Sequence, residues 1–166
     1  MYRLRPSRDA DLRRIHEIYA HAVRTGVATF EIEPPDVAEM TRRRADVLAR
    51  GLPYLAAEVE GGEVAGYAYA APYRSRPGYR FTVEDSIYLD PRWQRMGIGQ
   101  ALLEALIEGC RAAGYRRMIA VIGGGRDNAA SLRLHARCGF TEAGVLEGVG
   151  YKFGRWLDSL LMQRAL

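Results

Sequence analysis

The sequence contains few cysteines and no apolar run long enough to cross a membrane. Only two of the 166 residues are cysteine, Cys110 and Cys138, and they form no CxxC pair. We therefore expect two buried thiols rather than a metal site, a disulfide framework or a nucleophile. No stretch of about 18 apolar residues occurs, so we expect no membrane span. The basic N-terminus has no apolar signal-peptide core, which predicts a cytoplasmic protein.

Metal-ligand spacing is missing, and lysine is nearly absent. The three histidines, His16, His21 and His135, form no HExxH or other ligand pattern, so we expect no metal. The 24 lysine and arginine residues are almost all arginine and give a net charge of +4, which leaves nucleic-acid binding as an alternative. However, the densest basic run, residues 41–50, falls on a predicted solvated helix face, and small anionic ligands explain local positive charge equally well. We expect neither a nucleic-acid nor a membrane partner.

The length and composition are those of one globular domain. Apolar residues make up 48% and charged residues 27% of the chain, so we predict a single domain over residues 1–166. Apolar periodicity and turn residues predict helices at residues 7–26, 34–51 and 127–139, and another that opens on Gly-Ile-Gly and ends near residue 113. Strands are predicted at residues 2–6, 54–60, 63–73, 81–90, 116–124, 140–150 and 151–166. Helices placed between strands indicate a mixed α/β fold.

One helix start has an unusual composition. The stretch "QRMGIGQALL" puts Gly97 and Gly99 where an apolar helical pattern begins, although glycine in a helix costs about 0.5–1 kcal/mol relative to alanine. The first N–H groups of a helix lack intrahelical partners, and glycine lets an anion approach them. A dinucleotide fingerprint would need a third glycine, and GxxxxGK[ST] is absent. The pattern alone therefore leaves two possibilities, a phosphate site and a tight structural turn.

The surroundings of this loop resemble a known family. Gln94, Gly97 and Gly99, behind "IYLDPRW", resemble the Q/R-x-x-G-x-G/A acyl-CoA signature of the GNAT N-acetyltransferase superfamily. The resemblance implies a GNAT-like fold, with a mostly antiparallel twisted sheet of about seven strands, a splayed parallel pair and about four flanking helices. It implies that acetyl-CoA binds, without a metal, to these residues: Ile87, Tyr88 and Leu89 along the pantetheine arm, and Arg95, Met96, Gly97, Ile98, Gly99 and Gln100 around the pyrophosphate.

A second part of the sequence resembles the same superfamily. "NAASLRLHARCGF", residues 128–140, is similar to the family run N-x-x-A/S-x-x-x-Y-x-x-x-G-F/Y. The resemblance implies that Asn128 contacts the cofactor. It places His135 where the family usually has the tyrosine that protonates the leaving thiolate, and histidine, with a reference pKa of about 6.5, can donate near neutral pH. The alternative is a structural histidine packed under Phe140.

Four further stretches narrow the resemblance. "TFEIEPPD", "YRSRPGYRFTVEDSIYL", "AVIGGGRDNAAS" and "GVGYKFGRWLDSLLMQ" are similar to phosphinothricin acetyltransferases and methionine sulfoximine acetyltransferases. Attack on a thioester needs a neutral amine, and a base that takes the amine's proton contributes roughly 10²–10⁴ in rate. By the resemblance, Glu84 is that base. Asp85 faces the other side of the strand, and we expect it to be structural.

The substrates of these families are amino acids, whose carboxylate suits arginine. The resemblance implies that Arg76, helped by Arg74 and Tyr79, binds that carboxylate, whereas the alternative is that these loop side chains only face solvent. It also implies that Phe30 and Glu31 form pocket walls. Trp156 lies in a region that packs near a two-fold dimer contact in the family, and a buried core position is the alternative for this side chain.

These observations predict one activity and leave two others open. We predict a cytoplasmic homodimer that moves the acetyl group of acetyl-CoA to the α-amine of a small amino acid or glutamate analogue, by direct transfer in a ternary complex. Neither cysteine has the setting of a covalent acyl carrier. The nearest alternative is acetylation of a peptide N-terminus, a polyamine or an aminoglycoside, and an acidic pocket would favour the last two. The other is a non-catalytic acyl-CoA- or nucleic-acid-binding module, against which Glu84 beside the cofactor loop argues.

Overall fold

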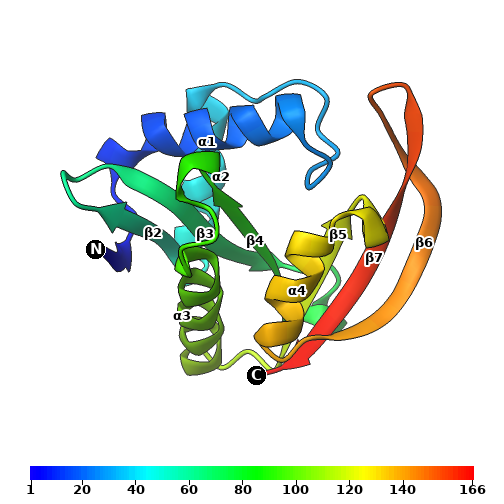
Figure 1. Cartoon of the computed structure of the whole chain (residues 1–166). Coiled ribbons are helices and arrows are strands. Elements are labelled where there is room, and N and C mark those ends of the chain that lie inside the picture. Colours follow the sequence, from blue (N-terminus) through cyan, green and yellow to red (C-terminus); the bar gives the residue numbers. More distant parts are fainter.

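A seven-stranded sheet forms the centre of the computed structural model, which describes all of residues 1–166 (Figure 1). The strands follow the order β1-β2-β3-β4-β5-β7-β6. They are β1 (Tyr2–Pro6), β2 (Tyr54–Val59), β3 (Val64–Pro72), β4 (Thr82–Leu89), β5 (Arg117–Gly123), β6 (Thr141–Lys152) and β7 (Arg155–Ala165). Only the β4–β5 pair is parallel. The predicted mostly antiparallel sheet with one parallel pair is confirmed.

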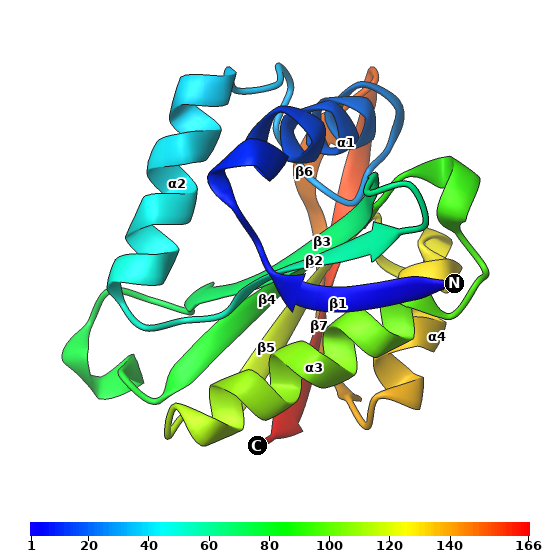
Figure 2. The same ribbon diagram turned by 90° about the vertical axis from the view of Figure 1, so that its left-hand side faces the viewer.

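Four helices cover the two faces of this sheet (Figures 1 and 2). The helices α1 (Leu12–Thr25) and α2 (Val37–Ala49) pack together on one face, and α3 (Ile98–Ala112) and α4 (Ala129–Arg137) lie on the other. The apolar stripe that predicted α3 is fully buried against the sheet at Leu102, Leu103 and Leu106. Burial of such a stripe supplies most of the stability of a helix in a globular protein.

Two helices begin later than the sequence predicts, one because a 3₁₀ turn precedes it and the other because an aspartate caps its start. Residues Asp9–Asp11 form a 3₁₀ turn, η1, in which the Asp11 carboxylate accepts the Arg8 N–H at 2.7 Å, so α1 begins only at Leu12. Asp36 caps α2 by accepting the Glu39 N–H at 2.8 Å. An N-cap residue has extended backbone, which places the preceding prolines in the loop.

The predicted boundary between the last two strands, at residues 150 and 151, is wrong. The strand β6 continues to Lys152, and the chain reverses at Phe153 and Gly154, whose φ angles are +53° and +73°. Two successive residues with positive φ are typical of a tight hairpin turn. Gly150 lies inside β6, and only glycine fits at this position, because a Cβ would lie 2.4 Å from Phe30 Cε2. This glycine marks a close approach rather than a turn.

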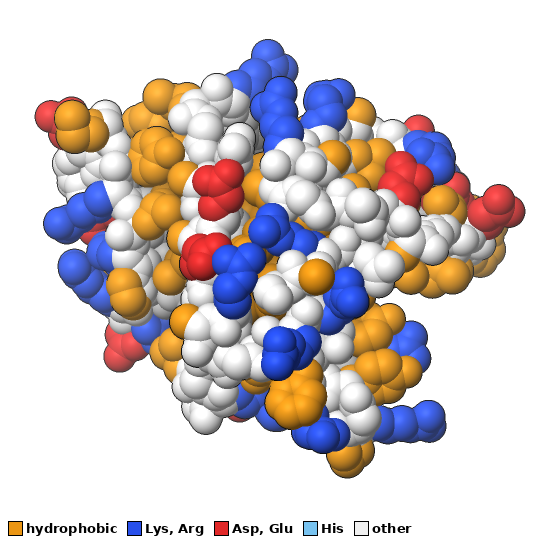
Figure 3. Space-filling model, turned by 90° about the horizontal axis from the view of Figure 1, so that it is seen from below, with side chains coloured by type: hydrophobic (Ala, Val, Ile, Leu, Met, Phe, Trp, Pro, Cys, Tyr) orange, Lys and Arg blue, Asp and Glu red, His pale blue; other side chains and the backbone are white.

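The basic run on α2 is paired, and only part of it is solvated. Arg42 is exposed and forms an ion pair with Glu39, whereas Arg44 is buried and donates a hydrogen bond to the Ser7 hydroxyl at 2.7 Å. The predicted solvated face is therefore wrong for Arg44. Seen from below, the basic side chains lie among apolar, acidic and other polar ones (Figure 3).

Both cysteines are buried and free, as predicted. Burial raises the pKa of Cys110 to about 12 and that of Cys138 to about 11. Since the thiolate is the nucleophile, neither side chain is activated near neutral pH. None of the helices has the length and apolar character needed to cross a bilayer, and no three His, Cys, Asp or Glu side chains are grouped to hold a metal ion.

Candidate active site

The two parallel strands separate part of the way along. The pairing of β4 with β5 covers only three positions, from Thr82 opposite Arg117 to Glu84 opposite Ile119. Beyond Glu84, β4 remains paired with β3, and β5 remains paired with β7. The unpaired halves splay apart, and two cavities lie in and beside this opening. The splayed pair that the sequence predicts is confirmed.

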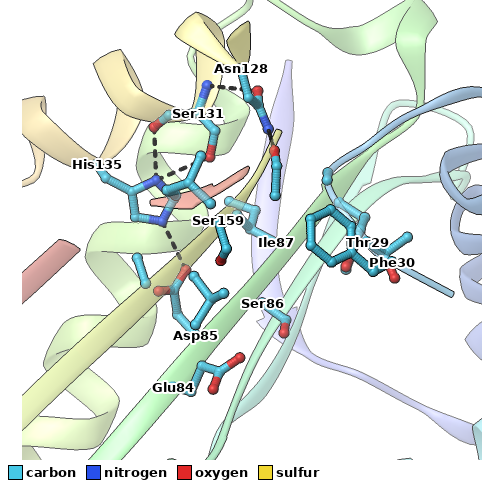
Figure 4. A pocket seen from close by; sticks show the side chains of 16 residues that line it. Thr29, Phe30, Glu84, Asp85, Ser86, Ile87, Asn128, Ser131, His135 and Ser159 are labelled. Carbon is cyan, nitrogen blue, oxygen red and sulfur yellow. Dashed lines mark hydrogen bonds and ion pairs between the residues drawn. The ribbon is translucent and has the colours of Figure 1, made fainter. Parts of the chain in front are cut away.

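The first cavity has a volume of about 270 Å³ and extends from the splayed strands to the loop after α1 (Figure 4). Its polar walls come from β4, from α4 and from this loop. The lining residues are Ala28, Thr29, Phe30, Glu84, Asp85, Ser86, Ile87, Tyr88, Ala120, Val121, Ile122, Gly123, Asn128, Ser131, His135 and Ser159. His135 is the only basic side chain among them, so this cavity holds two carboxyl groups and one imidazole.

Glu84 lies at the point where the strands separate, and its carboxyl group has no hydrogen-bond partner in the protein. Burial raises the pKa of Glu84, and the nearby charge of Asp85 raises it further. A carboxylate in such surroundings binds a proton more readily than one in water. The geometry therefore provides a half-buried base in the first cavity.

Asp85 also lines this cavity, and it forms a buried ion pair with His135. The His135 Nε2 lies 3.0 Å from Asp85 Oδ2, and its Nδ1 lies 2.8 Å from the backbone oxygen of Ser131 and 3.3 Å from the Ser131 hydroxyl (Figure 4). A carbonyl oxygen only accepts, so Nδ1 carries a proton. Burial lowers the pKa of His135, but the hydrogen bond and charge of Asp85 outweigh it and leave that pKa raised.

The two interpretations of His135 describe one arrangement. The ring packs edge-on against Phe140, with the ring centroids 5.1 Å apart, as a structural histidine would. The same ring lines the first cavity and contacts the Ser131 hydroxyl. Packing against Phe140 therefore does not remove this side chain from the site.

The second cavity continues from the first and has a volume of about 610 Å³. The two share the residues Ala28, Ile87, Tyr88, Asn128 and Ser131. The remaining walls of the second cavity are Ala22, Leu89, Gln94, Arg95, Gly97, Gly99, Gln100, Ala130, Arg133, Leu134 and Arg137. Of the residues predicted to bind the cofactor, eight line this cavity. The other two do not, because the Met96 side chain is exposed and that of Ile98 points into the core.

The Gly-Ile-Gly sequence opens α3 against this second cavity. Gly97 is the N-cap with φ +80°, a conformation that favours glycine. The first intrahelical donor is Ala101 N–H to the Gly97 oxygen, so the N–H groups of Ile98, Gly99 and Gln100 have no partner within the helix. At Gly99 a Cβ would lie 3.1 Å from Leu89 Cδ1. One glycine thus makes the turn and the other lets the helix end approach β4.

The predicted substrate residues are dispersed. Phe30 lines the first cavity, whereas the Glu31 carboxylate faces Arg43 at 2.7 Å and lines neither cavity. Arg74 stacks on the ring of Tyr79, with 5.7 Å between Cζ and the ring centroid. Arg74, Arg76 and Tyr79 are exposed on the loop between β3 and β4, and none of them lines either cavity.

Several lining residues were not found by sequence reasoning. Arg133 and Arg137, one helical turn apart on α4, add two cations to the second cavity. Their four-residue spacing was visible in the sequence, but nothing there indicated which face of the helix would meet the cavity. Ser131 lies in both cavities, and only the fold brings its hydroxyl next to His135.

The geometry suits a long ligand with phosphate groups at one end. Free N–H groups at the start of α3, with Arg95, Arg133 and Arg137 nearby, are typical of a phosphate site. Ile87 and Tyr88 line both cavities, Leu89 lines the second and Glu84 the first, so this part of β4 connects the helix end with Glu84. The residues present therefore fit acetyl-CoA.

Comparison with known proteins agrees with this geometry. Residues 13–140 match the model of the acetyltransferase (GNAT) family. The chain is 55% identical to phosphinothricin N-acetyltransferase of Alcaligenes faecalis over 163 residues, covering 98% of this chain and 82% of that protein. It is 45% identical to L-methionine sulfoximine/L-methionine sulfone acetyltransferase of Pseudomonas aeruginosa, covering 93% and 88%.

A solved structure is similar over the same range. The phosphinothricin acetyltransferase of Sinorhizobium meliloti, determined in complex with AcCoA, is 50% identical with a TM-score of 0.96, and the match covers 99% of this chain and 88% of that one. The family model, the relatives of high identity and the shared fold all agree with the cavity geometry. The chain belongs to the GNAT acetyltransferase family.

Proposed function

We propose that residues 1–166 form one N-acetyltransferase domain that acetylates the α-amine of a small amino acid or a glutamate analogue, such as phosphinothricin or methionine sulfoximine. The observation that carries the proposal is the pair of connected cavities along the splayed strands, with Glu84 in one and the free helix end of α3 in the other. The names of the relatives support the substrate class. Both substrates occupy the site together, and the acetyl group passes directly between them.

Acetyl-CoA lies in the second cavity. Its pyrophosphate accepts hydrogen bonds from the N–H groups between Arg95 and Gln100, and its pantetheine arm follows Ile87, Tyr88 and Leu89. Asn128 contacts the cofactor from the wall that the two cavities share. The acetyl-CoA supplies the activated acyl group, and the chain's part is to hold it beside the amine.

Glu84 is the base in this proposal. The acceptor arrives as an ammonium ion, which has no free electron pair, and the Glu84 carboxylate takes one of its protons. The raised pKa of Glu84 supports this role, since a base is most effective when its pKa lies near the working pH. The neutral amine then attacks the thioester carbon, and its nitrogen loses a second proton to water as the C–S bond breaks and the amide forms.

His135 supplies the proton for the leaving sulfur. When the C–S bond breaks, its electron pair goes to sulfur, which must then be protonated. The Nδ1–H of His135 donates to the Ser131 backbone oxygen at 2.8 Å and also lies 3.3 Å from the Ser131 hydroxyl. In the proposed step this proton moves to Ser131 Oγ as the Ser131 proton passes to sulfur. Asp85 stabilises the cationic form of His135 beforehand. The step ends with a neutral imidazole and free thiol.

Arg76, with Arg74 and Tyr79, binds the acceptor's carboxylate in this proposal. Since these side chains line neither cavity, their loop has to move toward the first cavity when the acceptor binds. Phe30 forms the wall of the first cavity on the side of the loop after α1. The ion pair between Glu31 and Arg43 holds the neighbouring part of this loop. One observation favours a second candidate, acetylation of a polyamine or aminoglycoside: the first cavity contains two carboxyl groups and no arginine.

A panel of amines separates these two candidates. Release of free thiol from acetyl-CoA should be fast with phosphinothricin, methionine sulfoximine or methionine sulfone, and slow with a polyamine or with 3-(methylsulfonyl)propylamine, which is methionine sulfone without its carboxylate. Arg76→Ala should lose roughly 10- to 100-fold in kcat/KM for methionine sulfone, as expected for a charge-assisted pair. If the wild type has equal kcat/KM for methionine sulfone and for this amine, the enzyme does not recognise the carboxylate, and the second candidate function is favoured.

The proposed enzyme is a cytoplasmic homodimer. The β6–β7 hairpin exposes an apolar surface formed by Val149, Tyr151, Phe153 and Trp156, and Trp156 is 71% exposed. Aromatic side chains are enriched in protein interfaces. A second copy of the chain is the partner that we propose for this surface.

A further inference from the structure

The chain has a single lysine, Lys152, and its side chain is buried. All the other basic residues among the 24 are arginine. Lys152 ends β6 and is 3% exposed. Its Nζ donates to the backbone oxygens of Gly26 and Thr29, each at 2.9 Å, and forms no ion pair. Burial lowers the pKa of Lys152, and the charge of Glu31 offsets only part of this effect. A lysine buried in this way is rare and costly.

The two carbonyls belong to the loop that forms one wall of the first cavity. We call residues 26–31 the acceptor loop. Thr29 is bound at its oxygen by Lys152 of β6 and at its hydroxyl by Tyr19 of α1, at 3.0 Å. The Phe30 ring packs directly on Gly150, two residues before Lys152. Three separate contacts, two of them from β6, therefore fix the residues that face the cavity.

We propose that Lys152 is a positioning residue of the acceptor site, whose ammonium holds the backbone of the acceptor loop so that Thr29 and Phe30 form the cavity wall. This inference rests on the proposed assignment of the first cavity to the acceptor amine. An ammonium is compact and can donate to two carbonyls that converge on one point, whereas a planar guanidinium needs more room. This explains why a chain that otherwise uses arginine has lysine here.

Steady-state kinetics separate a positioning role from a merely structural one. Lys152→Met keeps the aliphatic stem and removes the donors. We expect KM for the acceptor amino acid to rise tenfold or more, while kcat changes less and the affinity for acetyl-CoA stays within twofold. Lys152→Arg should restore little of the loss. Arg155→Met is the matched control, because Arg155 is exposed and lies directly across the hairpin from Lys152, and it should behave as wild type.

A second variant covers the case in which Lys152→Met does not fold. Gly150→Ala adds a Cβ that would lie 2.4 Å from Phe30 Cε2 and so pushes the acceptor loop from the same side. It should produce the same selective rise in KM for the acceptor. A folded Lys152→Met or Gly150→Ala enzyme whose acceptor KM stays within twofold of the wild-type value overturns the proposal.

The single lysine also allows a test that does not depend on activity. Labelling with lysine carrying ¹⁵N at Nζ gives one side-chain NMR signal, and the two hydrogen bonds should protect its protons from exchange with water. An ammonium that exchanges as fast as free lysine contradicts the hold on the loop. If the wild type acetylates no amino acid, the proposed function fails, yet a protected signal still confirms the contact that Lys152 makes.

Discussion

The Glu84 carboxyl group is half-buried next to Asp85. Burial and the charge of Asp85 both raise the pKa of Glu84 above the ordinary 4.5. Only the ionised form can take a proton from the acceptor. The rate of acetyl transfer should therefore fall as the pH drops through this raised pKa, and the acid limb of kcat/KM should lie above pH 4.5.

Replacing this carboxylate tests the base directly. Glu84→Gln keeps the shape of the side chain but cannot accept a proton at neutral pH. We expect kcat to fall by roughly 100-fold or more while the affinity for acetyl-CoA is unchanged. Turnover within a few-fold of wild type between pH 7 and pH 9 would show that another group is the base.

Ser131 tests the route of the second proton. Ser131→Ala removes the hydroxyl that touches His135 Nδ1 and leaves the Asp85–His135 pair in place. We expect kcat to fall by about 10- to 100-fold, within the range for general acid catalysis, with acetyl-CoA affinity retained in calorimetry. Full turnover in this variant would mean that the sulfur is protonated by another route, such as water.

At the scale of elements, the start of α3 combines two requirements in three residues. The helix needs a left-handed N-cap at Gly97 and a close approach to Leu89 at Gly99. The N–H groups left free by this arrangement carry the partial positive charge of the helix end. The cost of glycine in the first turn is thus offset by packing against β4 and, in the proposed function, by phosphate binding at this helix end.

Gly99→Val should abolish acetyl-CoA binding, because a branched side chain would occupy the space between the helix end and the phosphates. The Cβ also crowds Leu89, so circular dichroism must first confirm that the variant is folded. The matched control is Gly78→Ala, at a glycine with open space around its Cβ position. If calorimetry shows unchanged acetyl-CoA affinity in a folded Gly99→Val protein, the pyrophosphate does not bind at this loop.

At the scale of the whole molecule, the β6–β7 hairpin projects beyond the helices at one end of the sheet (Figure 1). Its exposed apolar side chains are contiguous in sequence with Gly150 and Lys152, which support the acceptor loop. A partner that covers the exposed side of this hairpin would therefore pack on the segment whose Gly150 and Lys152 support the acceptor loop.

Trp156→Glu should convert a dimer into a monomer, because a charge would be buried without a partner at the contact. Analytical ultracentrifugation should give twice the chain mass for the wild type and the chain mass for the variant. Leu48→Glu, at an exposed apolar residue of α2 outside the hairpin, is the control and should remain dimeric. A wild type that sediments as a monomer at micromolar concentration contradicts the proposed assembly.

The sequence by itself determined the type and order of the elements. The apolar periodicity of α1 and α3, and the turn residues between strands, are local signals, and local signals fix local structure. The helix start at Gly97 could be predicted for the same reason, since the free N–H groups belong to one helix end, whereas the cofactor contacts proposed there stay a prediction. The errors, such as the start of α2 and the turn at Phe153, arose where a side chain distant in sequence or a cap decided the boundary.

Only the tertiary structure decided which side chains meet. The sequence predicts a structural Asp85 and does not name its partner, which the fold supplies in His135, 50 residues away, because the splayed strand faces α4. The arginines of the β3–β4 loop lie near Glu84 in the sequence, yet they remain outside the cavity. Lys152 contacts a loop more than 120 residues earlier in the chain. A contact of this kind depends on how strands and helices pack, which no local pattern of residues contains.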